Sequence, residues 1–193
     1  MKVVFASHNQ GKVNEVVKLL QMPNLEVLSL DEAGLSDFEV EETGETFADN
    51  ALLKAQAVGE KTQLPAIADD SGLVVNALGG RPGVYSARLI SGSDADRCQE
   101  VLRLMTDQLD RTAKFVTSVC WYNPETPEQE FFEGEVSGRI AAAAAGSSGF
   151  GYDPIFIPDG YTETFAQLGL EVKNQLSHRA RAIAKLKVFL NDR

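Results

Sequence analysis

The apolar positions of this chain follow two repeats, one typical of helices and one typical of strands. Between Val13 and Leu20 they recur at the i, i+3, i+4, i+7 spacing of an amphipathic helix. Three later segments also carry a helical pattern: one that begins near Thr46, one over Ala95–Leu109 and one from His178 to about Leu190. Thr46 and Asp49 have the spacing of a capping box, which marks the start of the second helix.

Six further segments have the composition and length of strands: Lys2–Ala6, Leu25–Leu30, Pro65–Val75, Ala113–Tyr122, Glu130–Ile140 and Ile155–Ile157. Helices and strands alternate at first, and paired strands follow late in the chain. This order predicts an α/β fold with a mixed central sheet flanked by helices. A chain of 193 residues can form one good core or two small lobes, so we expect a single domain over residues 1–193.

The most informative stretch runs from Ala66 to Arg88, AIADDSGLVVNALGGRPGVYSAR. It opens like a buried strand, continues with two adjacent carboxylates, Asp69 and Asp70, and then passes through two glycine turns. Burying a charge costs several kcal/mol unless it is paired or bound to a metal. Adjacent strand residues point to opposite faces, so at most one of the two easily serves a given site. The pair is therefore either a hydrated strand end or a metal or acid–base site.

The bulk composition excludes several classes of partner. A net charge of −10 argues against nonspecific binding to nucleic acid or to an anionic membrane. No apolar run approaches the roughly 20 residues that span a bilayer, and the N-terminal apolar stretch is too short for a signal peptide. Cys98 and Cys120 lie far apart and outside any CxxC motif, which predicts reduced, buried thiols rather than a zinc site or redox pair. We therefore expect a cytoplasmic protein.

Several other groups of residues could carry chemistry, and each also has a plain structural explanation. The turn at residues 7–12 precedes a helix whose N-terminus suits phosphate, yet it lacks the Walker spacing and could be an ordinary turn capped by Asn9. The acidic residues at 39–45 form a charge run, which is usually a solvated face. The Phe150–Asp153 loop could stack on a purine, or its ring could pack under the glycines.

Polar residues on two predicted helices are equally open to interpretation. Asn50 and Lys54 are one helical turn apart and share a side of the helix, where they could form a solvated stripe. Lys173, with His178 and Arg179 near the start of the last helix, could be exposed and idle. The residues alone do not decide between these interpretations.

A resemblance to one family covers nearly the whole chain. Besides the stretch from Ala66 to Arg88, the matching segments are Ala6–Lys12 (ASHNQGK), Glu41–Ala55 (EETGETFADNALLKA), Gly149–Pro154 (GFGYDP) and Lys173–Arg179 (KNQLSHR). Together and in this order they resemble the inosine/xanthosine triphosphate pyrophosphatases, which hydrolyse non-canonical purine nucleoside triphosphates. The resemblance implies two lobes with the active-site cleft between them, and a homodimer.

The resemblance also implies a role for each motif residue. Asp70 would be the catalytic base and, with Glu41, a ligand of Mg²⁺. The implied substrate-binding residues are Ser7, His8, Asn9, Gln10, Gly11, Lys12, Lys54, Ser71, Phe150, Gly151, Tyr152, Asp153, Lys173, His178 and Arg179. The turn at residues 7–12 and Lys54 would hold the triphosphate, and the residues from 150 onward would bind the base. Many family members have glycine where this chain has His8, which leaves open whether that side chain contacts substrate.

The expected reaction is attack of water on the α-phosphorus of ITP, dITP or XTP, with pyrophosphate leaving and Mg²⁺ as cofactor. Two other functions stay open: a pyrophosphatase for modified pyrimidine or methylated guanine nucleotides, and a non-catalytic nucleotide-binding module. The Phe150–Asp153 and Ser177–Arg179 segments favour purines. The paired carboxylates Asp69 and Asp70 argue against a module without catalysis.

Overall fold

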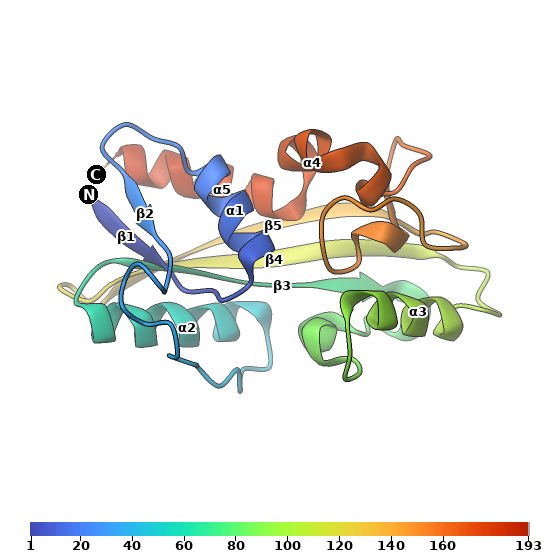
Figure 1. Ribbon diagram of the computed structural model, residues 1–193, viewed down its shortest axis with the longest axis horizontal. Helices are drawn as coiled ribbons and strands as arrows, with labels where there is room; N and C mark the ends of the chain where they lie inside the picture. The colour runs from blue at the N-terminus through green and yellow to red at the C-terminus, as the bar shows by residue number, and fades with distance from the viewer. Residues whose placement is uncertain (193) are drawn as a thin grey trace. The chain divides into compact units, whose positions relative to one another are not determined.

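The computed structural model describes residues 1–192 and contains a six-stranded sheet with the order β2-β1-β3-β4-β5-β6 (Figure 1). The strands are β1 (Lys2–Phe5), β2 (Glu26–Leu28), β3 (Ala66–Val75), β4 (Thr112–Asn123), β5 (Glu128–Ile140) and β6 (Phe156–Pro158). β1 runs parallel to both β2 and β3, whereas β5 and β6 are antiparallel. The sheet is therefore mixed, and each strand lies on a segment that the sequence predicts as a strand.

The helices begin where side chains satisfy the free N–H groups of the first turn. The α-helices described are α1 (Gln10–Leu19), α2 (Phe47–Thr62), α3 (Asp94–Leu104), α4 (Phe165–Leu176) and α5 (His178–Asn191). Thr46, Ser93 and Thr164 each form a capping box at the start of α2, α3 and α4. Each such cap stabilises its helix by about 1 kcal/mol. None of the helices in residues 1–192 is long and apolar enough to cross a bilayer.

The chain divides into two compact units, and the first has its strands between two helical layers. It comprises Met1–Asp70, Thr117–Gly134 and the C-terminal part from Arg181. Val3 and Phe5 pack in a core with residues of α1 and α5, while Val4 and Ala6 pack in a second core with residues of α2. This alternation follows the period of two of a β-strand. Figure 1 shows α1 and α5 on one face of these strands and α2 on the other.

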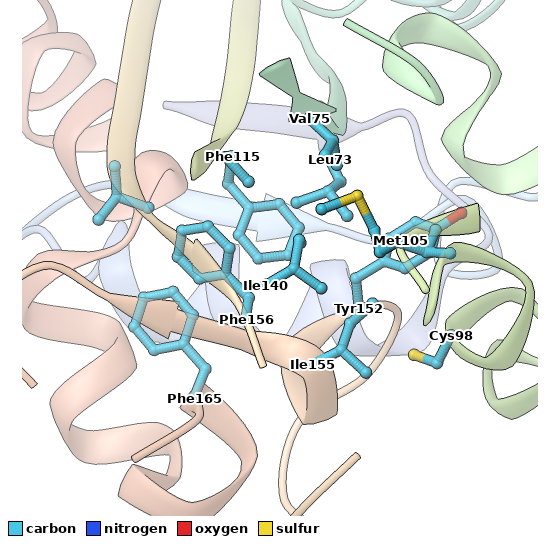
Figure 2. Packing of buried hydrophobic residues seen from close by; sticks show 13 residues of the cluster. Leu73, Val75, Cys98, Met105, Phe115, Ile140, Tyr152, Ile155, Phe156 and Phe165 are labelled. Atoms are coloured by element: carbon cyan, nitrogen blue, oxygen red, sulfur yellow. The ribbon is translucent and has the colours of Figure 1, made fainter. Parts of the chain in front are cut away.

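The second unit, Ser71–Val116 with Glu135–Ala180, has a single core (Figure 2). Leu73 of β3 and Met105, the C-cap residue of α3, pack there against a row of aromatic rings. The ring centroids of Phe115 and Phe156 are 4.6 Å apart, and those of Phe156 and Phe165 are 5.5 Å apart. Such ring pairs add about 0.5–1.5 kcal/mol to the stabilisation from burial.

Three helical segments differ from the sequence prediction. The helix α4 was not predicted, because Gly169 interrupts its pattern and takes a left-handed φ of 83°. The helix α3 ends at Leu104, before the predicted end at Leu109, a residue that is fully exposed. In addition, Gly83–Arg88 forms a 3₁₀ helix, η2, after the first glycine turn.

Candidate functional site

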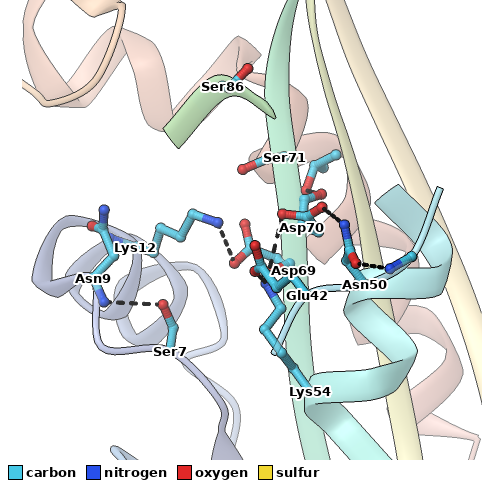
Figure 3. Close-up of polar contacts among 12 residues, drawn as sticks. Ser7, Asn9, Lys12, Glu42, Asn50, Lys54, Asp69, Asp70, Ser71 and Ser86 are labelled. Carbon is cyan, nitrogen blue, oxygen red and sulfur yellow. Dashed lines mark hydrogen bonds and ion pairs between the residues drawn. The ribbon is translucent and has the colours of Figure 1, made fainter. Parts of the chain in front are cut away.

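The turn between β1 and α1 carries the first predicted site residues (Figure 3). Asn9 caps α1, because its Oδ1 accepts the N–H of Lys12 at 3.0 Å. Ser7 Oγ accepts the N–H of Asn9 at 3.2 Å. Lys12 Nζ lies 3.1 Å from Oδ1 of Asp69, whose side chain is fully buried. The turn therefore presents a helix N-terminus and an ammonium group next to the carboxylates of β3.

The His8 side chain lies on the exposed part of the same turn. Its Nε2 is 2.9 Å from the carbonyl oxygen of Phe38. A carbonyl only accepts, so Nε2 carries the proton in this contact. The ring thus ties the turn to the chain just before the acidic residues at 39–45. Gln10 and Gly11 form the first turn of α1, and the Gln10 side chain bonds within that helix.

Asp70 is a buried carboxylate on β3 with partners from α2. Asn50 Nδ2 donates to its Oδ2 at 3.1 Å, and Lys54 Nζ lies 3.7 Å from its Oδ1. Burial raises the pKa of Asp70, Lys54 and Lys12 lower it, and the charge of Glu42 raises it further. Desolvation dominates, so the net effect is a raised pKa. A carboxylate in this state is suited to accept a proton from water near neutral pH.

Lys54 connects the acidic segment to β3. Its Nζ donates to Glu42 Oε1 at 2.7 Å and to the backbone oxygen of Asp69 at 2.7 Å. Glu41 is exposed, and within residues 1–192 no hydrogen bond or ion pair holds its carboxylate. The structure therefore brings Glu42 beside Asp70 and leaves the neighbouring Glu41 unengaged.

Asn50 is named from the sequence as part of a polar stripe with Lys54, but neither its burial nor its bond to Asp70 is predicted. It is fully buried, and its Oδ1 accepts the N–H of Gly44 at 2.8 Å while its Nδ2 binds Asp70. A Cβ on Gly44 would lie 2.5 Å from the Cβ of Asp49, so only glycine fits this approach. One signal in the sequence could have indicated this role: Asn50 directly precedes Ala51, which lies on the apolar face of α2. An amide buried at such a position needs hydrogen-bond partners.

Replacing Asp70 with Asn is expected to raise the melting temperature at pH 7 in metal-free buffer. A raised pKa in the folded state means that stability is fully present below the unfolded pKa and is lost as pH rises through the folded pKa. Asparagine stays neutral and escapes this loss, while its side-chain oxygen still accepts from Asn50. The gain over wild type should therefore be larger at pH 7 than at pH 4 in thermal melts. A lower melting temperature for the variant at pH 7 would mean that the Lys54 ion pair outweighs desolvation.

The second unit gathers the remaining predicted residues around Phe150. Lys173 Nζ lies 4.1 Å from the ring centroid, and the Arg179 guanidinium carbon lies 5.7 Å from it. Lys173 Nζ also pairs with Asp153 Oδ2 at 2.6 Å, and both side chains are 2% exposed. Arg179 Nη2 donates to Ser71 Oγ at 3.0 Å. Two cations and an aromatic ring therefore lie together, which suits a flat, electron-rich ligand.

Three other predicted residues of this unit serve the protein structure. The His178 ring stacks on Phe115 with centroids 4.9 Å apart. Tyr152 is 5% exposed in the core, and its hydroxyl donates to a backbone carbonyl of η2 at 2.7 Å. Asp153 Oδ2 accepts the N–H of Phe150 at 2.9 Å. In this structure Asp153 therefore fixes the loop that presents Phe150.

Comparison with known proteins places this chain in a family. The Ham1 family profile matches residues 3–189. A dITP/XTP pyrophosphatase from Symbiobacterium thermophilum is 48% identical over 187 residues, which cover 95% of this chain and 92% of that protein. The chain belongs to the Ham1 family. The resemblance found in the sequence is confirmed.

Solved structures of Ham1 proteins share the fold. The Staphylococcus aureus Ham1 protein gives a TM-score of 0.88 at 43% identity and covers 100% of this chain and 99% of its own. A HAM1 protein from Coxiella burnetii gives a TM-score of 0.90 at 37% identity over 100% of both chains. The predicted α/β fold with a mixed sheet flanked by helices is confirmed.

The donor chemistry of the first unit of this Ham1-family chain fits a divalent cation. The carboxylates of Glu42, Asp69 and Asp70 outnumber the ammonium groups of Lys12 and Lys54, so one negative charge is left over. In residues 1–192 no cluster of three or more Asp, Glu, His or Cys residues could enclose a metal. Mg²⁺ prefers oxygen ligands and commonly binds through one or two carboxylates plus substrate phosphates. The residues present fit that kind of site.

Proposed function

We propose that this Ham1-family protein is a Mg²⁺-dependent pyrophosphatase that converts dITP, ITP and XTP to the monophosphate and pyrophosphate. The observation that carries the proposal is the buried carboxylate of Asp70, with raised pKa, near the ammonium groups of Lys12 and Lys54. The name of the Symbiobacterium thermophilum relative supports the substrate class. We also propose that residues 1–193 form one pyrophosphatase domain.

In the proposed reaction, Asp70 takes a proton from the water that attacks the α-phosphorus, and pyrophosphate leaves. Lys12 and Lys54 bind phosphate oxygens and neutralise the charge that builds on them, which is the main task in phosphoryl transfer. The N–H groups at the start of α1 are suited to bind further phosphate oxygens. Bound Mg²⁺ supplies additional positive charge on the phosphates.

The site of attack can be read directly from hydrolysis of ITP in ¹⁸O-labelled water. Attack on the α-phosphorus puts the label into the monophosphate, where mass spectrometry detects it. Label in the pyrophosphate would place the attack on the β-phosphorus and contradict the proposed reaction.

For the base, we propose that a purine stacks on Phe150 and that Arg179 donates to its O6. Hypoxanthine and xanthine carry an oxygen acceptor at this position, and an arginine can only donate. Base–aromatic stacking contributes about 1–3 kcal/mol and does not depend on the base. Arg179 therefore supplies the discrimination and Phe150 the general affinity.

Activity is expected to vanish in excess chelator and to return with added Mg²⁺. We propose Asp70 and Glu41 as the protein ligands, because the family resemblance implies this pair. Glu41→Gln should then raise the Mg²⁺ concentration needed for half-maximal activity by about tenfold, as expected when one ligand of a metal site weakens. Steady-state rates over a Mg²⁺ titration measure this.

Glu42→Gln is the matched control, because it removes a carboxylate from the adjacent position. If Glu42→Gln alone raises the Mg²⁺ requirement, Glu42 is the ligand and the assignment of Glu41 is wrong. Full hydrolysis of ITP in excess chelator would remove the metal from the mechanism altogether.

Two further parts of the proposal concern compartment and assembly. We propose that the protein works in the cytoplasm, and the free, buried thiols of Cys98 and Cys120 support a reducing compartment. We also propose a homodimer, on the strength of the family resemblance. Sedimentation equilibrium tests the dimer, and a monomer mass at micromolar concentration would contradict it.

A further inference from the structure

The loop that presents Phe150 is rich in glycine and needs an external anchor. Gly146, Gly149 and Gly151 all take positive φ values, between 60° and 84°. A Cβ on Gly149 would lie 2.1 Å from Asp153 Oδ2, so this close turn requires glycine. Glycine has the widest conformational freedom of any residue, and a loop of this composition does not hold one geometry by itself. The hydrogen bonds that hold this loop therefore affect how Phe150 binds a ligand.

Two residues of α3, one helical turn apart, hold both backbone groups of Gly151. Asp94 Oδ2 accepts the N–H of Gly151 at 2.7 Å. Cys98 Sγ donates to the Gly151 carbonyl at 3.3 Å. Burial and the charges of Asp94 and Asp153 raise the pKa of Cys98 to about 12, so this group stays a thiol and keeps its donor. Asp94 and Cys98 thus hold the backbone of Gly151, which follows Phe150 in the chain and precedes the buried Asp153.

The Asp94 carboxylate is itself held in place by a neighbouring arginine. Asp94 Oδ1 pairs with Arg97 Nη2 at 2.5 Å, and Arg97 Nη1 donates to the carbonyl of Gly92 at 2.7 Å. Asp94 is also the first residue of α3, where a negative charge is favourable near the N-terminus. Each carboxylate oxygen therefore has one charge-assisted hydrogen bond, and these are stronger and shorter than neutral ones.

We infer that Asp94 is a positioning residue for base recognition, which acts by holding the Gly151 N–H and so setting the place of Phe150 and Asp153. This inference rests on the proposed function, because it assigns the loop to the purine base. Asp94 belongs to the second unit, whereas the carboxylate and lysines proposed to act on the phosphates belong to the first. Its loss should therefore weaken substrate binding and base selectivity and leave the chemical step largely unchanged.

Asp94→Ala is expected to raise the KM for ITP about tenfold and to change kcat by less than about twofold. Tenfold is at the lower end of what a hydrogen bond to a charged group contributes. The ratio of kcat/KM for ITP to that for ATP should fall by a similar factor. Asp94→Asn should recover much of the loss, because its amide oxygen can still accept from Gly151.

Ser93→Ala is the matched control for a purely structural effect. Ser93 caps the same helix, and its Oγ accepts the N–H of Asp96 without a bond to the loop. It should lower the melting temperature and leave the KM for ITP unchanged. Equal kinetic effects of Ser93→Ala and Asp94→Ala would show that Asp94 only stabilises α3 and would overturn the inference.

Amide hydrogen exchange at Gly151 gives a readout that does not need activity. The Gly151 N–H should be protected in wild type and in Ser93→Ala and should exchange much faster in Asp94→Ala. A wild-type protein without purine triphosphate hydrolysis would refute the proposed function and leave this exchange result standing. An active wild type with normal selectivity in Asp94→Ala would refute the positioning role alone.

Discussion

Asp70→Asn is expected to lower turnover of ITP by at least about 10²-fold, the usual scale for the loss of a general base. The substitution keeps the shape of the side chain and its hydrogen bond from Asn50, but it removes both the proton acceptor and the negative charge for the metal. Steady-state pyrophosphate release at saturating Mg²⁺ measures the effect. Far-ultraviolet circular dichroism should show an unchanged fold.

Asp69→Asn is the matched control for this result. Asp69 pairs with Lys12, so we expect the effect of this substitution to reach the phosphates through that lysine. We expect a smaller loss than for Asp70→Asn. Near-normal turnover of Asp70→Asn would show that the mechanism is wrong, and a larger loss in Asp69→Asn would move the base to the neighbouring residue.

Arg179→Ala is expected to lower ITP turnover strongly and to narrow the gap between ITP and ATP. Wild type should hydrolyse ATP more slowly by about 10²-fold or more, because the amino group of adenine faces a donor and leaves buried polar groups unpaired at about 1–3 kcal/mol each. Without the guanidinium, no donor distinguishes hypoxanthine from adenine, so the preference for ITP over ATP should decrease. The ratio of kcat/KM for the two substrates is the measured quantity.

Arg181→Ala, an exposed arginine on the same helix, controls for the loss of a positive charge. It should keep the wild-type ratio. Arg179 is 1% exposed, so Arg179→Met serves as a second variant that fills the buried space without a hydrogen-bond donor if the alanine variant does not fold. Unchanged discrimination in a folded Arg179 variant would show that this residue does not read the base.

The sequence predicted the strands and the capped helices because their signals are local. Alternation of apolar residues and the Thr46 capping box depend on a few neighbours, and the structure confirms both. The helix α4 escaped prediction because Gly169 breaks its period, and the core of the second unit supports it through Phe165. Where the local sequence signal is ambiguous, as in α4, tertiary packing determines whether the helix forms.

The site was only partly predictable from the sequence, because many of its contacts join residues far apart in the chain. The motifs identified Asp70 and Lys54 as site residues. They did not predict that Asn50 bonds both to Asp70 and to the backbone of Gly44, and so links the acidic segment at 39–45 to that carboxylate. Strand alternation separated Asp69 from Asp70, yet Asp69 still has a partner in Lys12. Contacts between residues far apart in the chain carry no periodic signal, so only the folded structure reveals them.

The proposed reaction is best tested by the initial rate of pyrophosphate release from ITP, XTP and ATP at equal concentration with Mg²⁺. For this reaction we expect rapid release from ITP and XTP, one pyrophosphate for each monophosphate formed, and a rate with ATP lower by about 10²-fold or more. Release of inorganic phosphate in place of pyrophosphate, or hydrolysis of ATP as fast as that of ITP, would contradict it.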